Sequence, residues 1–226
     1  HWHCHFIQKF EDECRIEFEN INSAYDSIVK PINEVYIEAW QTGKTGIPIV
    51  DACMRCLNET GFMNFRMRAM LVSFACFGLH LSWRTIHQPL ARLFTDYEPG
   101  IHLSQIQMQA GVIGINALRV YSPSKQFLDH DPAAQFVKRW VPELADRTPA
   151  EIAHAEECNI PEYIRPIVNQ SVRSKKMKDQ IYLIRKSDEG RFQSSKTLQS
   201  HGSQKKISRK RKPKNNFLIK KLFSFC

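Results

Sequence analysis

An apolar run from about Ala69 to Leu81 constrains the fold of this chain more than any other feature, and Arg66 and Arg68 stand just before it. At the rise of an α-helix the run spans about 20 Å, which is short of the roughly 30 Å of a bilayer core. A helix that is apolar nearly all round is buried in a protein core. We therefore predict a buried central helix over about residues 64–81 and no membrane-spanning segment.

A second helix is predicted immediately before the first. Pro48 suits its first turn, because the missing N–H would be unpaired there, and Gly61 suits the residue past its end. Its apolar side chains recur at three- and four-residue steps and form one face, at Ile49, Ala52, Cys53, Cys56 and Leu57.

The rest of the body is also helical in pattern, and no strand alternation of useful length is present. Residues 83–94 and 132–140 predict further helices, the first of them with Pro89 as a bend. Residues 95–131 are interrupted by glycines and prolines, which favours short helices and loops of the kind that line a ligand site. The predicted fold class is all-α.

Charge divides the chain into two parts. Residues 1–186 carry 21 basic and 21 acidic side chains, whereas residues 187–226 carry 11 basic and 2 acidic ones. Ser, Gln and Lys dominate the second part, so it buries too little surface to offset its ordering entropy. We predict a helical domain at 1–186 and a disordered basic tail at 187–226. The tail is interpreted as a non-specific nucleic-acid contact, with a nuclear address or a merely charged terminus as the alternatives.

Seven cysteines are present, and their odd number and irregular spacing do not predict a secreted disulfide framework. We expect reduced thiols in a chain that is not secreted and lies in the cytoplasm, at the nucleoid in a prokaryote, or in the nucleus. A monomer is expected, without membrane contact. No metal site is predicted, because the His and Cys residues at 1–5 are adjacent and have no partner cluster downstream.

Several blocks occur in an order and at a spacing that match a known family over roughly residues 1–170. The blocks are Trp2, Ala39 to Gln41, Gly43 to Gly46, Pro48 to Arg55, Arg66 with Arg68, Trp83-Arg84, Asp96, Arg119 to Pro123, and Phe136 to Leu144. They resemble the C-terminal, FAD-binding helical domain of the DNA photolyase and cryptochrome family. The resemblance is to a divergent photolyase-like branch, and we expect an N-terminal truncation, because a phosphate-holding loop and an antenna domain are not found.

The resemblance implies a flavin site. Arg68 would lie beside the flavin ring and pair with Asp96, and its fixed guanidinium would stabilise an anionic reduced flavin. The alternative is a structural ion pair at the helix end. Glu98 takes the place of a second acid that contacts the flavin. His102 takes a place that is often Asn in the family, and a solvent-facing loop histidine is its alternative.

The resemblance also implies contacts with DNA. Trp2 matches an aromatic residue that stacks on a flipped-out lesion, although it could instead cover the edge of the core. Arg119 matches an arginine that contacts DNA phosphate, and an exposed structural arginine is the alternative. Met108 stands where a second lesion-stacking tryptophan often lies.

Other positions depart from the family pattern. Phe65 falls where a polar or sulfur residue usually faces the reactive flavin nitrogen. Trp83 matches the middle member of a three-tryptophan electron-transfer chain, but Ile106 replaces the member nearest the flavin and Lys30 the outermost one. These substitutions weaken the expectation of photoreduction by that route.

Taken with the resemblance, these residues predict a FAD-dependent lyase that repairs cyclobutane pyrimidine dimers in damaged DNA, single-stranded DNA included. Light would drive an electron from reduced flavin to the dimer. One alternative is a non-catalytic, cryptochrome-like photosensor or flavin-binding module, which Phe65, Ile106 and Met108 favour. The other is a truncated product with DNA affinity alone.

Overall fold

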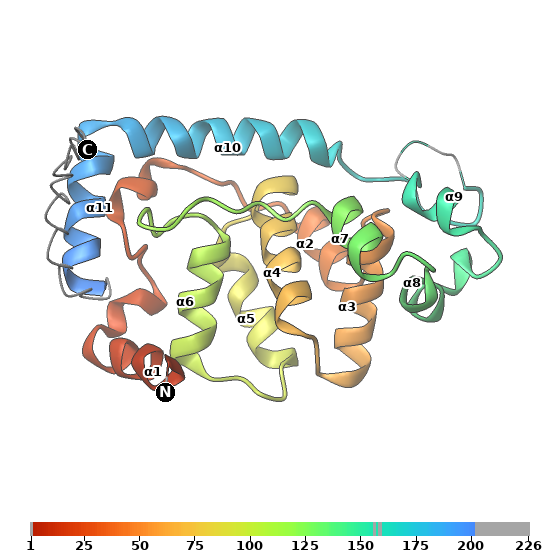
Figure 1. Cartoon of the computed structure of the whole chain (residues 1–226), viewed down its shortest axis with the longest axis horizontal. Helices are drawn as coiled ribbons and strands as arrows, with labels where there is room; N and C mark the ends of the chain where they lie inside the picture. The colour runs from red at the N-terminus through yellow and green to blue at the C-terminus, as the bar shows by residue number, and fades with distance from the viewer. Residues whose placement is uncertain (1, 156, 158–159, 202–226) are drawn as a thin grey trace, which may run out of the picture.

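The computed structural model describes residues 2–155, 157 and 160–201, and these residues form helices joined by loops (Figure 1). No strand occurs among them, which confirms the predicted all-α class. The elements in chain order are α1 (Trp2–Asp12), η1 (Cys14–Glu17), η2 (Ser23–Ser27), α2 (Glu34–Gln41), α3 (Pro48–Thr60), α4 (Phe65–Ser73), η3 (Phe74–Gly78), α5 (Trp83–Leu93), α6 (Pro99–Gln109), α7 (Pro123–His130), α8 (Gln135–Trp140), η4 (Pro142–Leu144), α9 (Pro149–Ala153), α10 (Gln170–Lys186) and α11 (Asp188–His201).

Helix α3 begins and ends as predicted. Pro48 occupies its first turn, and Gly61 ends it in the left-handed conformation with φ of 70°. The predicted apolar face is buried and packs against α4, α7 and α8. Helix α3 therefore lies between several of the helices that contain the sequence blocks named above.

The loop before α3 is held by the carboxylate of Asp51, which is fully buried. Its Oδ1 accepts from the Thr45 N–H at 2.8 Å and from Thr45 Oγ1 at 2.6 Å, while Oδ2 accepts from the Gly46 N–H at 3.0 Å and from the Tyr163 hydroxyl. A buried carboxylate is tolerated only when such donors surround it. The block from Thr45 to Asp51 thus has a structural role in positioning α3.

Helix α4 is shorter than predicted. It begins at Phe65, with the Asn64 side chain accepting from the Met67 N–H at 3.1 Å, and at Phe74 it gives way to the π-helical turn η3. Met67 and residues 69–78 are buried, so the predicted core position is confirmed. A π turn widens the helix by one residue per turn, and sequence periodicity does not reveal it. We call residues 65–78 the α4–η3 rod. None of the described helices is long and apolar enough to cross a membrane.

Two cations close the C-terminal end of the rod. Lys30 Nζ donates to the carbonyl oxygens of Cys76 at 3.0 Å and Leu81 at 3.2 Å. Arg173 of α10 donates to the carbonyl oxygens of Gly78 at 2.6 Å and Leu79 at 3.1 Å. These oxygens have lost their helical partners, so the two side chains satisfy them and complement the negative end of the helix dipole.

The composition of residues 187–226 predicts disorder, and that prediction is wrong for residues 188–201, which form α11. Helix α11 packs against α10 and η2. Ser187 Oγ accepts from the Gly190 N–H at 3.0 Å, and Asn22 Nδ2 donates to Ser194 Oγ at 3.1 Å. Polar contacts with the body, rather than an apolar stripe, hold this helix. Residues 202–226 lie outside the described residues.

Candidate functional site

A cavity of about 420 Å³ lies between α4, α5, α6 and the loop that joins α5 to α6. Phe62, Phe94, Leu90, Ile101 and Ile106 make much of its wall apolar. The structure brings all five predicted cofactor-binding residues to this one cavity. They are Phe65, Arg68, Asp96, Glu98 and His102.

Arg68 and Asp96 form a two-pronged ion pair at the cavity wall. Arg68 Nη1 lies 2.9 Å from Asp96 Oδ1, and Nη2 donates to Oδ2 at 3.0 Å. The guanidinium carbon also lies 4.1 Å from the centre of the Phe94 ring, and Arg68 Nε donates to the Met63 carbonyl oxygen. The predicted pairing is confirmed. Because several partners hold it, the guanidinium presents a positive charge in one fixed place.

His102 is buried in α6, so the alternative of a solvent-facing loop histidine is excluded. Its Nε2 lies 3.0 Å from the His87 carbonyl oxygen, and since a carbonyl only accepts, Nε2 carries the proton. Burial, together with the nearby charge of Arg68, lowers the pKa of His102 to about 4. His102 is therefore neutral at pH 7 and leaves Arg68 as the positive group at the cavity.

Glu98 lines the cavity, and its carboxylate is also the N-cap of α6. Oε1 accepts from the Gly100 N–H at 3.1 Å and Oε2 from the Ile101 N–H at 2.7 Å. These bonds satisfy two backbone donors at the start of the helix. The carboxylate is thus fixed beside the cavity by the helix that it begins.

Phe65 and Ile106 take up different positions on the wall. Phe65 is 59% exposed at the first turn of α4, whereas Ile106 is buried. Neither side chain has a hydrogen-bonding group. Gln105, from the same wall, has a buried Oε1 without a hydrogen-bond partner among the described residues. A donor on a bound ligand would satisfy that oxygen.

Trp83 lies outside the cavity and is buried in α5. Its Nε1 donates to Asn20 Oδ1 at 2.7 Å, and the Arg84 guanidinium carbon lies 4.9 Å from the centre of its indole ring. Two histidine rings separate it from the cavity, with centroid spacings of 5.8 Å from Trp83 to His87 and 6.4 Å from His87 to His102. Its predicted role in electron transfer stays a prediction.

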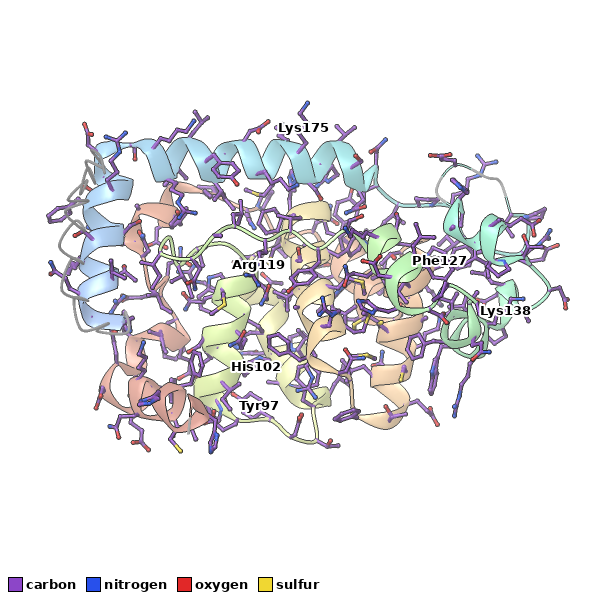
Figure 2. All side chains as sticks on the ribbon, viewed as in Figure 1. Tyr97, His102, Arg119, Phe127, Lys138 and Lys175 are labelled. Atoms are coloured by element: carbon purple, nitrogen blue, oxygen red, sulfur yellow. The ribbon has the colours of Figure 1, made fainter. Side chains whose placement is uncertain are left out.

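Of the three predicted DNA-binding residues, Met108 and Arg119 do not line the cavity. Met108 lies on α6 outside the cavity and packs against Ile16, Ile21 and Ile113, and its predicted place at the lesion stays a prediction. Met108 comes two residues after Ile106 on α6, so the two side chains lie on different faces of the helix. Arg119 is exposed on the segment between α6 and α7 (Figure 2). Trp2 begins α1, and its side chain lies outside what the structure describes.

A profile described as the FAD binding domain of DNA photolyase matches residues 1–182. The chain belongs to this family. A photolyase structure from Sulfolobus tokodaii, described as holding two FAD molecules, has a TM-score of 0.76 and 35% identity over 80% of this chain and 42% of its own. A Synechocystis cryptochrome structure has a TM-score of 0.73 and 26% identity, over 79% of this chain and 39% of its own.

Curated relatives of this FAD-binding domain include deoxyribodipyrimidine photo-lyases and cryptochromes. The Thermus thermophilus photo-lyase is 37% identical over 122 residues, which are 53% of this chain and 29% of the relative. A Gloeobacter violaceus cryptochrome DASH is 38% identical over 117 residues, 51% of this chain and 23% of the relative. The chain thus spans less than a third of the length of the curated relatives that it matches.

The cavity fits the ring system of a flavin, which is a flat apolar body with a polar edge. Its volume is that of a small-molecule pocket, its walls are apolar, and Arg68 and the unsatisfied Gln105 oxygen can meet polar ring atoms. Phe94 and Tyr97 complete the wall, and sequence reasoning missed both. The signal was their position on either side of Asp96, which places two aromatic rings beside the predicted acid.

Proposed function

We propose that this chain binds FAD in the cavity between α4, α5 and α6 and acts in light-driven repair of cyclobutane pyrimidine dimers in DNA. The observation that carries the proposal is the Arg68–Asp96 ion pair on the wall of an apolar cavity, in a chain that belongs to the FAD-binding domains of DNA photolyases. When bound, reduced FAD supplies the electron that light transfers to the lesion.

The cavity residues divide the work of holding such a cofactor. Arg68 stabilises negative charge on the ring, and Asp96 fixes the position of the guanidinium. Neutral His102 adds no competing charge. The apolar side chains of the wall would exclude water from a bound ring, which would strengthen the Arg68 interaction because the local dielectric would be low.

DNA is the proposed partner of the repair function. Arg119 is exposed and free to reach a phosphate, and Trp2 is proposed to hold a flipped base by stacking. The basic residues between 187 and 226 are proposed to add non-specific, salt-sensitive affinity. The named photo-lyase relatives support a DNA substrate.

This chain is proposed to hold FAD weakly by itself. Among the described cavity residues, Arg68 is the one lysine or arginine, and Asp96 already pairs with it. The FAD diphosphate therefore has no second cation on this wall. Phosphate groups contribute strongly to affinity only where cations or backbone N–H groups meet them.

A cryptochrome-like photosensor without repair activity is the second candidate. Phe65 and Ile106 favour it, because neither offers a hydrogen bond or an electron at a cavity position where family members carry such groups. The cryptochrome DASH relative is in keeping with this reading. Loss of pyrimidine dimers under light, with reductant supplied, separates the two candidates.

The first experiment is a visible spectrum of the purified chain with added FAD, before and after desalting. We expect a flavin band that shifts on binding and is largely lost on desalting. Arg68→Gln should reduce the shift, whereas Arg92→Gln, at an exposed position of α5 outside the cavity, should leave it unchanged. An identical spectrum for free FAD and for FAD with the chain would refute the cofactor site.

A further inference from the structure

Helix α10 carries an unusual concentration of positive charge. Residues 1–169 have 15 basic and 20 acidic side chains, whereas the 17 residues of α10 have six basic and one acidic. The body without α10 is therefore acidic overall. Helix α10, which runs along an edge of the molecule in Figure 1, thus has five more basic than acidic side chains, whereas residues 1–169 have five fewer.

The basic residues of α10 fall into two groups. Its arginines bind the body, because Arg173 donates to the carbonyl oxygens after η3 and Arg185 Nη1 donates to the Asn116 carbonyl oxygen at 2.9 Å. Its lysines do not. Lys175, Lys176, Lys178 and Lys186 form no ion pair with any residue that the structure describes.

Three of these lysines share a line on the helix with an aromatic ring. Tyr182 lies four residues from both Lys178 and Lys186, and Lys175 lies one turn before Lys178, so the four side chains are neighbours along one face. Tyr182 is 44% exposed. We call Lys175, Lys178 and Lys186 the lysine stripe. Buried Met177 and Ile181 fix the other face of α10 against η3.

The lysine stripe lies far from the cavity. In Figure 2 Lys175 projects outward from α10, whereas Tyr97 and His102 lie toward the opposite edge of the molecule. A ligand on the stripe therefore does not compete with a ligand in the cavity. The stripe extends over about 17 Å at helical rise, which is long enough to follow a few phosphates of an extended strand.

We propose that the outer face of α10 is a second nucleic-acid site, which binds single-stranded DNA or RNA without sequence preference. The lysine stripe neutralises backbone phosphates, and Tyr182 stacks on an unpaired base between them. Lysines that alternate with an exposed aromatic ring are the combination that single strands require, because every base offers a face for stacking. A duplex keeps its bases paired and offers Tyr182 no such face.

A lipid surface fits α10 less well. Its outward aliphatic side chains are Val172 and Leu183, and the polar residues Ser171, Asp179 and Gln180 stand among them. An interfacial helix needs a continuous apolar face to enter the headgroup region. Charge complementarity without that face favours a hydrated polyanion, so binding to vesicles of anionic phospholipid is an outcome that counts against the proposal.

The test is fluorescence anisotropy of a labelled oligothymidylate titrated with the full chain over a range of salt concentrations. The stripe variant combines three substitutions, Lys175→Gln, Lys178→Gln and Lys186→Gln. It should bind at least about tenfold more weakly at low salt, and the magnitude of its slope of log affinity against log salt should fall by about 2. Removing Lys44, Lys125 and Lys138 in the same way is the matched control, with an equal loss of charge on other helices and loops.

Tyr182 provides the second test. Tyr182→Ala should weaken oligothymidylate binding at least about fivefold, leave the salt slope unchanged and remove the preference over a duplex of equal length, and Tyr182→Phe should restore it. Residues 202–226 carry nine basic side chains and are present in every variant, so their contribution cancels. The proposal would be overturned if the stripe and control variants had equal slopes of log affinity against log salt. It would also be overturned if the stripe bound anionic vesicles but not oligothymidylate.

Discussion

The two ends of the α4–η3 rod use their cations in opposite ways. At the C-terminal end, Lys30 and Arg173 donate to four backbone carbonyl oxygens. At the N-terminal end, Arg68 is held by Asp96 on the wall of an open cavity. One end is closed by cations that complete the backbone, and the other presents a cation to a ligand. Mutations should therefore affect stability at the first end and binding at the second.

The largest effect is expected for Lys30→Met. The substitution keeps the apolar stem and leaves the carbonyl oxygens of Cys76 and Leu81 buried without a donor. An unsatisfied buried polar group costs on the order of 1–3 kcal/mol, so the free energy of unfolding should fall by about 4 kcal/mol. Urea denaturation measures the change, with Lys44→Met at an exposed position as the control. Equal midpoints for the two variants would show that the cap is dispensable.

The next effect is a pH dependence at the cavity end. The pKa of His102 is lowered from 6.5 to about 4, so the unfolded chain binds more protons between these values. Stability from this group is complete above pH 6.5 and is lost as the pH falls toward 4, by about 3 kcal/mol in total. Other histidines also titrate, so the measurement is the difference in unfolding free energy between wild type and His102→Gln across pH 4–7. A difference that does not vary with pH would contradict the assignment.

A smaller effect is expected for flavin affinity when Arg68 is changed. Arg68→Gln removes the fixed charge and should weaken binding of reduced FAD by about 2 kcal/mol, or about thirtyfold, with less effect on oxidised FAD. Arg68→Lys keeps the charge but loses the two-pronged bond to Asp96, so it should recover only part of the loss. Anaerobic and aerobic titrations measure the two affinities, and equal losses in both redox states would argue against charge stabilisation.

The smallest expected change is in the stability of Asp96→Asn. The Asp96 side chain is 52% exposed, and an ion pair so open to solvent stabilises a fold by less than about 1 kcal/mol. Its unfolding midpoint should therefore stay near that of the wild type while flavin binding weakens. A loss as large as that of Lys30→Met would mean that the cavity end is as structural as the capped end.

Sequence reasoning found the parts of this molecule whose cause is local. Pro48 and Gly61 mark the bounds of α3 because each has a backbone preference of its own, and the resemblance brought Arg68 and Asp96 together. The turn η3 and the contacts of Lys30 with the end of the rod could not be predicted in this way. Both depend on carbonyl oxygens that meet a side chain 46 or more residues away in the sequence.

Helix α11 also depends on contacts that its own sequence does not reveal. Its sequence lacks an apolar stripe, so its composition predicts disorder, but buried Gly190 lets it turn closely past α10, where an added Cβ would lie 1.9 Å from the Ile184 oxygen. Such a contact exists only once α10 is in place. Met108 likewise occupies a matching sequence position but faces a different cluster, because position along a helix does not fix which side a neighbour will cover.

The meeting of α1 with α11 has a consequence for synthesis on the ribosome. Lys9 donates to the backbone oxygen of His201, 192 residues later, and His201 Nε2 lies 2.6 Å from Glu13 Oε2. At about 5–20 residues per second, Lys9 and Glu13 wait on the order of 10–40 s for His201, whereas α6, against which α1 mainly packs, is made earlier. During that time the helices from α3 to α6 can pack among themselves. Helix α1 therefore packs against α6 before its last polar contacts, those with the end of α11, can form.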